Sequence, residues 1–309
     1  MPSYGITHES GTLKRVMVHH PGKELDLANR DPEAHHFETA VDTRRFIEDH
    51  KRLMDALTEA GVEVQQVREL IRDDEEVLAQ SYRCPNLVFT RDSSTVTDDG
   101  AFLFRMGLPS RRRETPVIKA AHQANGVPIA LETSEPDTFE GGGFAFLEGG
   151  TAVAGLCERS KQGALDQMGD YLLANGLVNL YVTLDMPEGC IHIDGEFAEL
   201  PGRVAISYAP VLDNAPAHFR TRHERWEGCF TEWLRETGWD IIEITKQEYR
   251  DMAANFLTVD TSLAIHYTGN PRVMKEVKDR GIDVVQIPGD EMKKGNGGIH
   301  CMTCLILRT

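Results

Sequence analysis

The feature that most constrains this chain is a pattern that occurs five times: an amphipathic helix, a glycine and a short apolar strand. The copies occupy residues 46–67, 117–131, 164–184, 229–244 and 272–287. In the first copy Phe46, Leu53 and Leu57 follow the spacing of one helix face. Each glycine stands where a helix C-cap needs a left-handed residue. Five copies of one supersecondary unit predict a repeat architecture of similar modules.

Paired short strands precede the last four helices and predict β-hairpins. Three of the pairs contain the turn signals DDG, EGG and LPGR, and the fourth, in residues 254–269, turns less obviously. A strand in residues 11–22 precedes the first helix, and the closing residues 299–309 are expected to pair with it and close the ring. The charged residues 70–80 are interpreted as a helical bridge into the second module. We find no linker and expect one domain over residues 1–309.

Composition limits the function classes. The 309 residues suffice for a large core, and 40% apolar with 27% charged residues is typical of a soluble globular protein. No apolar run is long enough to cross a bilayer and no signal peptide is evident, so we expect the cytoplasm. The net charge of −16 opposes nucleic acids and anionic membranes as partners. It also suits a cationic substrate, although solubility alone explains most of it.

Unusual polar residues occur where predicted strands begin or end. They are Asn86 and Asp92 in the second module, Glu140 in the third, His192 and Asp194 in the fourth, and His300 and Cys301 beside the last strand. His192 and Asp194, two apart in a predicted strand, would point to the same face. If the modules form a ring, equivalent strand ends converge on its axis. One thiol, imidazoles and several carboxylates would then share one site.

This set of side chains suits covalent chemistry on a guanidino carbon. A thiol with a pKa of ~8.5 becomes a good nucleophile when a cation, an imidazole or a positively charged substrate stabilises its thiolate. A histidine tuned by a carboxylate moves protons in both directions. Paired carboxylates favour a guanidinium, with its five planar N–H donors. Individually, Asp92 and Glu140 also fit surface loops, and His192 and Asp194 also fit a solvated strand face.

The two cysteines near the end of the chain form a CxxC pair. Zinc would need two further ligands, and none stands nearby at suitable spacing. A thioredoxin-like site would need the pair at a helix start, whereas it is predicted here in a strand. We therefore interpret Cys301 as the nucleophile and Cys304 as a packing residue. All six cysteines are expected to stay reduced.

At this point the chain resembles a known superfamily, the guanidino-modifying enzymes of the pentein fold. These include arginine deiminases, amidinotransferases and dimethylarginine hydrolases. The resemblance covers nearly the whole chain through GTLKRVMVHHPGKEL, PNLVFTRDSS, GLPSRRRE, FEGGGF, ERSKQGAL, IHIDG and GGIHCMTC. Arginine deiminase is the most similar. The fold implied is α/β, a five-bladed propeller of ββαβ modules.

The resemblance also implies residue roles. Cys301 would be the nucleophile and His192 the general acid and base. Asp92, Asp194 and Glu140 would bind the guanidinium, with Glu140 also orienting His192. Asn86, Arg111 and Arg159 would clamp a substrate carboxylate; each arginine lies nineteen residues beyond its carboxylate, Asp92 or Glu140. A solvated surface loop remains the alternative for Arg111 in RRR, and an ordinary charge at a helix start the alternative for Arg159.

Three departures from the family concern the substrate. Gly143 stands where deiminases commonly have Asp, and Asn296 where several have Arg. The helical insertion found in many arginine deiminases between the first two modules is also missing.

The expected reaction is hydrolysis of L-arginine or a related guanidino compound to a ureido product such as citrulline, with release of ammonia. An amidinotransferase and an arginine dihydrolase giving ornithine are the enzyme alternatives, and Asp92 as a second carboxylate favours a deiminase over a dihydrolase. A ribosome-binding pentein factor is the non-enzyme alternative. No metal or organic cofactor is expected. The expected partner is a small guanidino substrate, and a homo-oligomer is left open.

Overall fold

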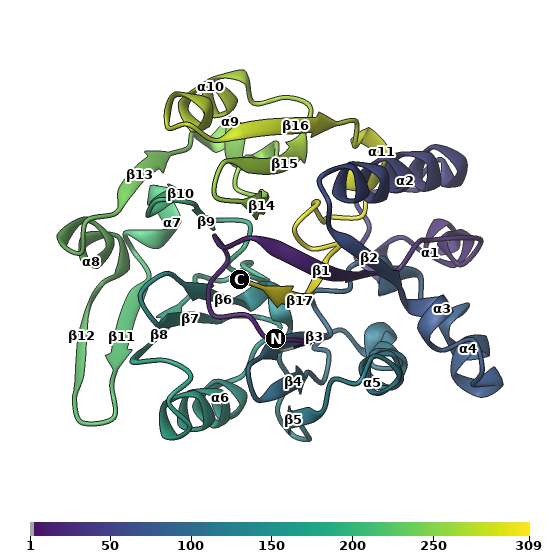
Figure 1. The fold of residues 1–309 in the computed structure, drawn as a ribbon, viewed down its shortest axis with the longest axis horizontal. Helices are drawn as coiled ribbons and strands as arrows, with labels where there is room; N and C mark the ends of the chain where they lie inside the picture. Colours follow the sequence, from purple (N-terminus) through teal and green to yellow (C-terminus); the bar gives the residue numbers. More distant parts are fainter. Residues whose placement is uncertain (1–2) are drawn as a thin grey trace.

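The structure, a computed structural model, describes residues 3–309. Within these residues five small sheets surround a common centre (Figure 1). In each sheet the first two strands are antiparallel, and the second is parallel to the third. The expected five-module α/β propeller is thus confirmed.

The five blades have the following strands. Blade one contains β17 (Cys304–Arg308), β1 (Leu13–Val18) and β2 (Glu63–Gln66); blade two β3 (Ser94–Thr97), β4 (Gly100–Leu103) and β5 (Ile129–Glu132); blade three β6 (Phe144–Leu147), β7 (Thr151–Leu156) and β8 (Leu180–Asp185); blade four β9 (Phe197–Leu200), β10 (Val204–Ser207) and β13 (Asp240–Glu243); and blade five β14 (Leu257–Asp260), β15 (Leu263–Tyr267) and β16 (Asp283–Ile287). In Figure 1 the first strand of each blade lies nearest the centre.

One main helix joins the second and third strand of each blade. These helices are α2 (Thr43–Glu59), α5 (Glu114–Ala124), α6 (Gln162–Ala174), α8 (Phe230–Glu236) and α10 (Pro271–Asp279). The glycine after each has a positive φ: +81° at Gly61, +72° at Gly126, +71° at Gly176, +84° at Gly238 and +81° at Gly281. L side chains rarely adopt this conformation, so glycine ends each helix and turns the chain into the outer strand. The five-fold pattern read from the sequence is confirmed.

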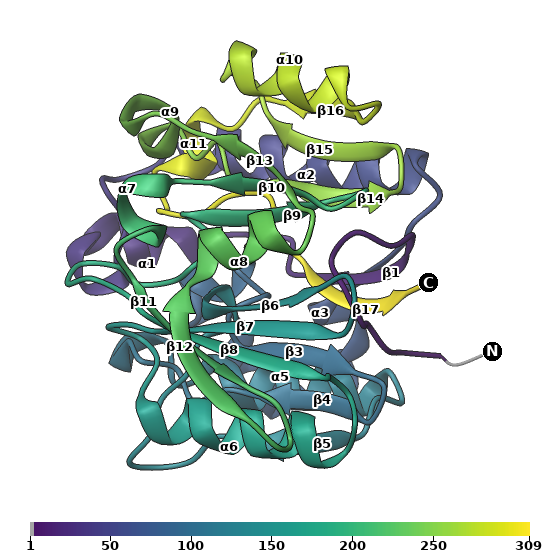
Figure 2. The same cartoon turned by 90° about the vertical axis from the view of Figure 1, so that its left-hand side faces the viewer.

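The ring closes between the two ends of the chain. Strand β17 pairs antiparallel with β1, with Val16 opposite Leu305 and Met17 opposite Cys304. Figure 2 shows the paired strands β1 and β17 on the same side of the molecule. The expected pairing of the last strand with the opening one is confirmed, and it places the segment before β17 at the centre.

A second hairpin was not expected from the sequence. Strands β11 (Pro216–Arg220) and β12 (Arg225–Cys229) follow the short helix α7 (Ala209–Leu212) inside module four, yet β11 pairs with β8 of blade three. Blade three therefore has five strands. This pairing joins neighbouring modules, so no local turn signal indicates it.

The remaining helices are short. The charged bridge is helical, as expected, in α3 (Val67–Leu70) and α4 (Glu75–Ser81). The others are α1 (Leu25–Arg30), α9 (Lys246–Arg250) and α11 (Asp290–Lys293). Among residues 3–309, no helix has the length and apolar character needed to span a membrane.

Candidate active site

The candidate site is built from the loops that lead into the innermost strands. Asp92 precedes β3, Glu140 precedes β6, His192 and Asp194 precede β9, and Cys301 precedes β17. The sequence analysis placed His192, Asp194 and Cys301 in strands, and this was wrong because all three lie in loops or turns. The N–H groups of Ile193 and Asp194 both donate to the carbonyl of Gly142, each over 3.1 Å. This contact, rather than a β-ladder, sets the position of the His192 loop.

His192 is held by Glu140. Its Nε2 donates to Glu140 Oε2 over 2.9 Å, while its Nδ1 lies 3.9 Å from both Asp92 Oδ1 and Asp194 Oδ1. The other oxygen of Glu140 accepts the N–H groups of Gly107 and Leu108 at 2.9 and 3.3 Å. Glu140 is completely buried. The imidazole is therefore fixed at one nitrogen and faces two carboxylates with the other.

Asp92 is held by a buried ion-pair cluster. Arg111 Nη1 donates to Asp92 Oδ2 over 2.7 Å, and Arg111 Nε donates to both oxygens of Glu114 at 3.1 Å. Within the described chain, Asp92 Oδ1 has no hydrogen-bond partner although it is buried. That oxygen faces His192 and is available for a further donor.

Cys301 lies between an acceptor and a donor. Its Sγ donates to Asp194 Oδ2 over 3.1 Å, and Asn255 Nδ2 donates to the same sulfur over 3.3 Å. Cys301 is buried. Asp194 thus stands between Cys301 and His192, with one oxygen toward each. Cys304 begins β17 and packs in a different apolar cluster from Cys301.

The electrostatics follow from burial and the three carboxylates. Burial lowers the pKa of His192, but Asp92, Glu140 and Asp194 outweigh it and raise this pKa to about 9. Burial, together with Asp194 and Asp92, raises the pKa of Cys301 well above its ordinary value. Without a further cation the site therefore holds a neutral thiol and an imidazolium at neutral pH.

Two connected cavities meet at these residues. The inner one, of about 20 Å³, is lined by Cys301, His192, Glu140, Asp92, Asn86, Arg111 and Arg159. The outer one, of about 470 Å³, shares His192 and Cys301 and is also lined by Asp194. Asn296 and Gly297 line both cavities, and Asn296 Nδ2 donates to the carbonyl of His36 over 2.8 Å. In this state the inner cavity has room for about one water molecule.

The three predicted carboxylate-clamping residues all reach the inner cavity, but their present partners differ. Arg111 is occupied by Asp92 and Glu114. Arg159 Nη1 lies 3.4 Å from Glu140 Oε1. Asn86 Nδ2 donates to the carbonyl of His35 over 2.9 Å, and its Oδ1 lacks a partner in the described chain. Their proposed role in binding a substrate carboxylate stays a prediction.

Three residues of the site were missed by the sequence analysis. Asn255 precedes the innermost strand of blade five, just as Asp92 and Cys301 precede the innermost strands of their blades. A search for polar residues at this position in every module could therefore have found it. Glu114 was hidden in its helix start. His36, which lines both cavities, has a φ of +58° and lies in an irregular segment without a periodic signal.

Asp92, Glu140 and His192 offer atoms within 4.8 Å of one another, a spacing that a metal ion could use. Several atoms of these three side chains already have protein partners. Arg111 Nη1 lies 2.7 Å from Asp92 Oδ2 and 3.8 Å from Glu140 Oε2, and His192 Nε2 is bonded to Glu140. The positive charge among these groups thus comes from the protein, and we do not assign them as metal ligands.

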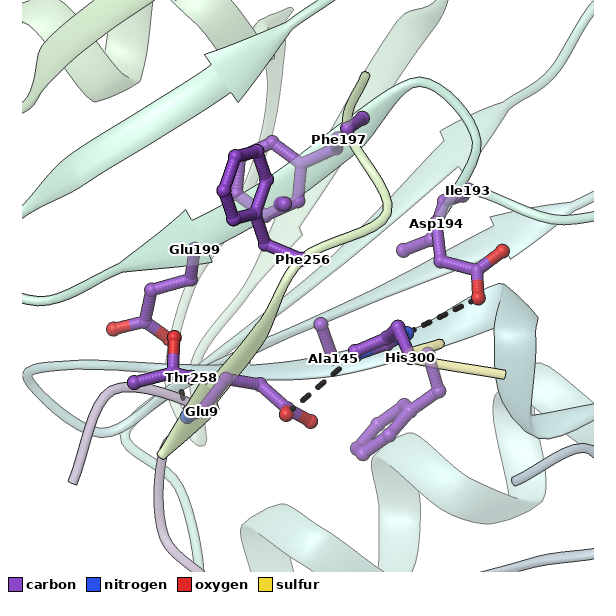
Figure 3. A pocket seen from close by; sticks show the side chains of 12 residues that line it. Glu9, Ala145, Ile193, Asp194, Phe197, Glu199, Phe256, Thr258 and His300 are labelled. Atoms are coloured by element: carbon purple, nitrogen blue, oxygen red, sulfur yellow. Dashed lines mark hydrogen bonds and ion pairs between the residues drawn. The ribbon is translucent and has the colours of Figure 1, made fainter. Parts of the chain in front are cut away.

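A further group of polar side chains lines a separate small cavity (Figure 3). It includes His300, which the sequence analysis had singled out, with Asp194 on one side and Glu9 on the other. Glu199 and Thr258 line the same small cavity.

Comparison with known proteins places the chain. The family model described as "Arginine deiminase" matches residues 73–308. The chain belongs to the arginine deiminase family. An arginine deiminase of Borrelia recurrentis (strain A1) is 25% identical in an alignment of 256 residues that covers 72% of this chain and 61% of that protein. The chain thus spans about three fifths of the length of that relative. The uncharacterized protein YkgA of Bacillus subtilis (strain 168) is 25% identical over 302 residues, covering 97% of this chain and 94% of that protein.

Solved structures share the fold. A DDAH from Pseudomonas aeruginosa, complexed with citrulline, has a TM-score of 0.73 at 21% identity and covers 96% of this chain and 100% of its own. The N-terminal domain of ArgZ, an arginine dihydrolase from the ornithine-ammonia cycle in cyanobacteria, has a TM-score of 0.71 at 20% identity, covering 95% of this chain and 96% of its own. These likenesses confirm the pentein fold.

Proposed function

We propose that the protein hydrolyses the guanidino group of L-arginine or a related compound, giving a ureido product and ammonia. The observation that supports this most is that Asp194 contacts the sulfur of Cys301 with one oxygen and faces His192 with the other. A guanidinium bound at Asp194 and Asp92 would present its carbon to the sulfur. Membership in the arginine deiminase family and the guanidino-related ligands and activities in the neighbours' names support the same substrate class.

The site suits a cationic substrate. Asp92 Oδ1 has no hydrogen-bond partner in residues 3–309, and an unpaired buried carboxylate oxygen is costly. A planar guanidinium satisfies such oxygens with parallel N–H donors. Its charge also offsets the two carboxylates that raise the pKa of Cys301. Substrate binding would therefore promote loss of the Cys301 thiol proton to solvent. The nucleophilic thiolate would then form only when a guanidinium is bound.

The reaction proceeds in two stages, formation of a covalent adduct and its hydrolysis. The Cys301 thiolate forms a C–S bond with the guanidino carbon, and His192, protonated below a pKa of about 9, gives its proton to the departing ammonia. A cationic thiouronium adduct remains on the sulfur. Neutral His192 takes a proton from water, whose oxygen bonds to the same carbon as the C–S bond breaks. The ureido product leaves after its extra proton goes to the sulfur, which restores the thiol, or to solvent, which leaves the thiolate; His192 is again protonated.

Entry of the substrate requires movement. Because the inner cavity holds about one water, the segment of residues 294–299 must shift to admit a guanidinium. The hydrogen bond from Asn296 to the carbonyl of His36 closes this segment over the cavity. In this role Asn296 would act as a latch.

Product analysis tests the proposal. The protein is incubated with a panel of guanidino compounds, with and without an amine acceptor, and the products are identified by mass spectrometry. A ureido product with ammonia is expected for at least one compound and should disappear in Cys301→Ala. Ornithine-type products would assign a dihydrolase, and transfer to the amine an amidinotransferase. If the wild-type protein consumes no guanidino compound, the proposal fails.

A further inference from the structure

His300, the residue before the proposed nucleophile, lies between two buried carboxylates. Its Nδ1 is 3.2 Å from Asp194 Oδ2, and its Nε2 is 3.6 Å from Glu9 Oε2. Figure 3 shows the ring of His300 between these two side chains in the small cavity. Nδ1 is the ring nitrogen within hydrogen-bond distance of a carboxylate, so it carries the N–H that donates to Asp194, while Glu9 faces the opposite edge of the ring.

Glu9 is itself held firmly. Its Oε1 accepts from Arg91 Nη1 over 3.0 Å, and its backbone N–H donates to Glu199 Oε2 over 3.2 Å. Arg91 Nε in turn donates to the carbonyl of His300 over 2.9 Å. The N-terminal segment, through Glu9 and Arg91, therefore fixes both the backbone and the ring of His300.

One oxygen of Asp194 serves two neighbours. Oδ2 accepts from Cys301 Sγ over 3.1 Å and from His300 Nδ1 over 3.2 Å. The direction of this carboxylate, and so its geometry to the sulfur, depends on the His300 contact. None of the reaction steps above uses His300 directly.

We propose that His300 is a positioning residue for the reaction: it aims Asp194 at Cys301 and at the guanidinium of the substrate, and Glu9 holds its ring for this purpose. The inference rests on the proposed function, because it takes a flat cation as the partner of Asp194. It predicts that the N-terminal segment contributes to catalysis although it lies behind the site.

The charges around the pair agree with this role. Asp194 is faced by His300, His192 and Cys301, with Glu196 two residues along the chain; His300 is faced by Asp194 and Glu9; and Glu9 is faced by Arg91, Arg308 and Glu199. Burial raises the pKa of Asp194, but the hydrogen bond from His300 and the charge of His192 bring it below its ordinary value. Without His300, the pKa of Asp194 rises. As the pH falls, Asp194 then becomes protonated at a higher pH than in the wild type and stops binding the cation there.

Two substitutions at one position separate positioning from packing. His300→Asn keeps an N–H donor near the place of Nδ1, so it can still donate to Asp194. His300→Gln places its donor near the place of Nε2, toward Glu9 and away from Asp194. Glu9→Gln is a third variant that leaves His300 in place and removes the charge behind it. Thermal unfolding of each variant checks that it folds.

Turnover against pH is the first readout. We expect His300→Gln to lower kcat/KM at least ~10-fold at neutral pH and to move the acid limb of its pH profile up by about one unit. His300→Asn should stay within about fivefold of wild type with its acid limb little moved, and Glu9→Gln should fall between them. Equal losses in the Asn and Gln variants, constant across pH, would indicate packing alone and overturn the inference.

A second readout does not depend on turnover. Chloroacetamidine is a flat cationic alkylating reagent, and chloroacetamide is its neutral counterpart. Peptide mass spectrometry measures the modification of Cys301 by each. The rate ratio of cationic to neutral reagent should fall at least ~10-fold in His300→Gln and much less in His300→Asn. If the rate ratio falls in His300→Gln but the wild-type protein turns over no guanidino compound, the proposed function is rejected and the positioning role is kept. An unchanged ratio in a folded His300→Gln would reject the role itself.

Discussion

Gly142 lies directly against the imidazole of His192: a methyl group on Gly142 would come within 2.4 Å of His192 Nδ1. The carbonyl of the same glycine accepts the N–H groups of Ile193 and Asp194. The glycine run before β6 thus supports the loop with the proposed acid and base, and a side chain at position 142 would push the ring away from the thiol.

Replacing Gly142 by Ala should therefore cost activity more than stability. The nearest atoms belong to the His192 ring, whose displacement by even 1 Å is expected to lower kcat/KM about 100-fold. Gly143→Ala is the matched control, because the closest atom to its methyl group would be the rotatable Oγ of Ser160 at 3.2 Å, and its other neighbours lie at ordinary contact distances of 3.9 Å or more. Steady-state kinetics and thermal unfolding of both variants measure the difference. Equal activity in the two would show that Gly142 does not set the position of His192.

The alkaline limb of activity should report His192. Its pKa is raised to about 9, so the protonated ring that ammonia departure requires is lost as the pH rises through that value. Glu140→Gln removes a carboxylate that raises this pKa, and the alkaline limb should move down by about one unit. The pH profile of kcat/KM measures it. Glu158→Gln, an exposed carboxylate at the outer cavity, is the control and should leave the limb in place.

The two cysteines near the end of the chain should respond differently to substitution. Cys301→Ala should abolish turnover with little loss of stability, because it removes the nucleophile. Cys304→Ala should retain turnover and lose about 1–2 kcal/mol of unfolding free energy, since its sulfur packs in the core beside Ser94. Activity assays and urea unfolding distinguish them. Residual turnover in Cys301→Ala, comparable to the wild type, would contradict a nucleophilic role.

Arg111 should matter for stability in a pH-dependent way. Burial raises the pKa of Glu114 to about 7 even though Arg111 opposes this. Arg111→Met leaves Asp92 and Glu114 without their cation and should cost about 3–5 kcal/mol. A protein with a carboxyl whose pKa is higher in the folded than in the unfolded state loses stability as the pH rises toward the folded-state pKa. Removing Arg111 raises the folded-state pKa of Glu114 further, so the loss of unfolding free energy should be larger at pH 8 than at pH 6.

Urea unfolding at the two pH values measures this cost. Arg113→Met is the control, two residues away and exposed, and should change stability little at either pH. A cost that shrinks toward pH 8 would contradict the assigned interactions.

The parts of the fold that the sequence predicted depend on local signals. Helix faces such as Phe46, Leu53 and Leu57 repeat within one element, and Gly61 and its four counterparts mark helix ends by their positive φ. The hairpin of β11 and β12 depends instead on pairing with β8 in another module, which no local pattern encodes.

The sequence indicated which residues come together in the candidate site, but not the backbone conformation of the segments that position them. Strand entries drew attention to Asp92, Glu140, His192, Asp194 and Cys301, and the structure brings these together at two connected cavities. The loop conformation of His192 arises from its contact with Gly142, fifty residues earlier in the chain, and could not be read locally. The contact between Arg111 and Glu114 could not be predicted either, because it depends on the burial of the start of α5 in the folded protein.

The antiparallel pair of β1 and β17 has a consequence for how the molecule assembles. The two strands lie almost 300 residues apart in the chain, and such distant pairing is among the slowest events in folding. During synthesis, blades two to five can form while blade one still waits for its innermost strand. The turn that contains Cys301 directly precedes β17, so the pairing that completes blade one also brings the thiol to the carboxylates and imidazole supplied by the other blades.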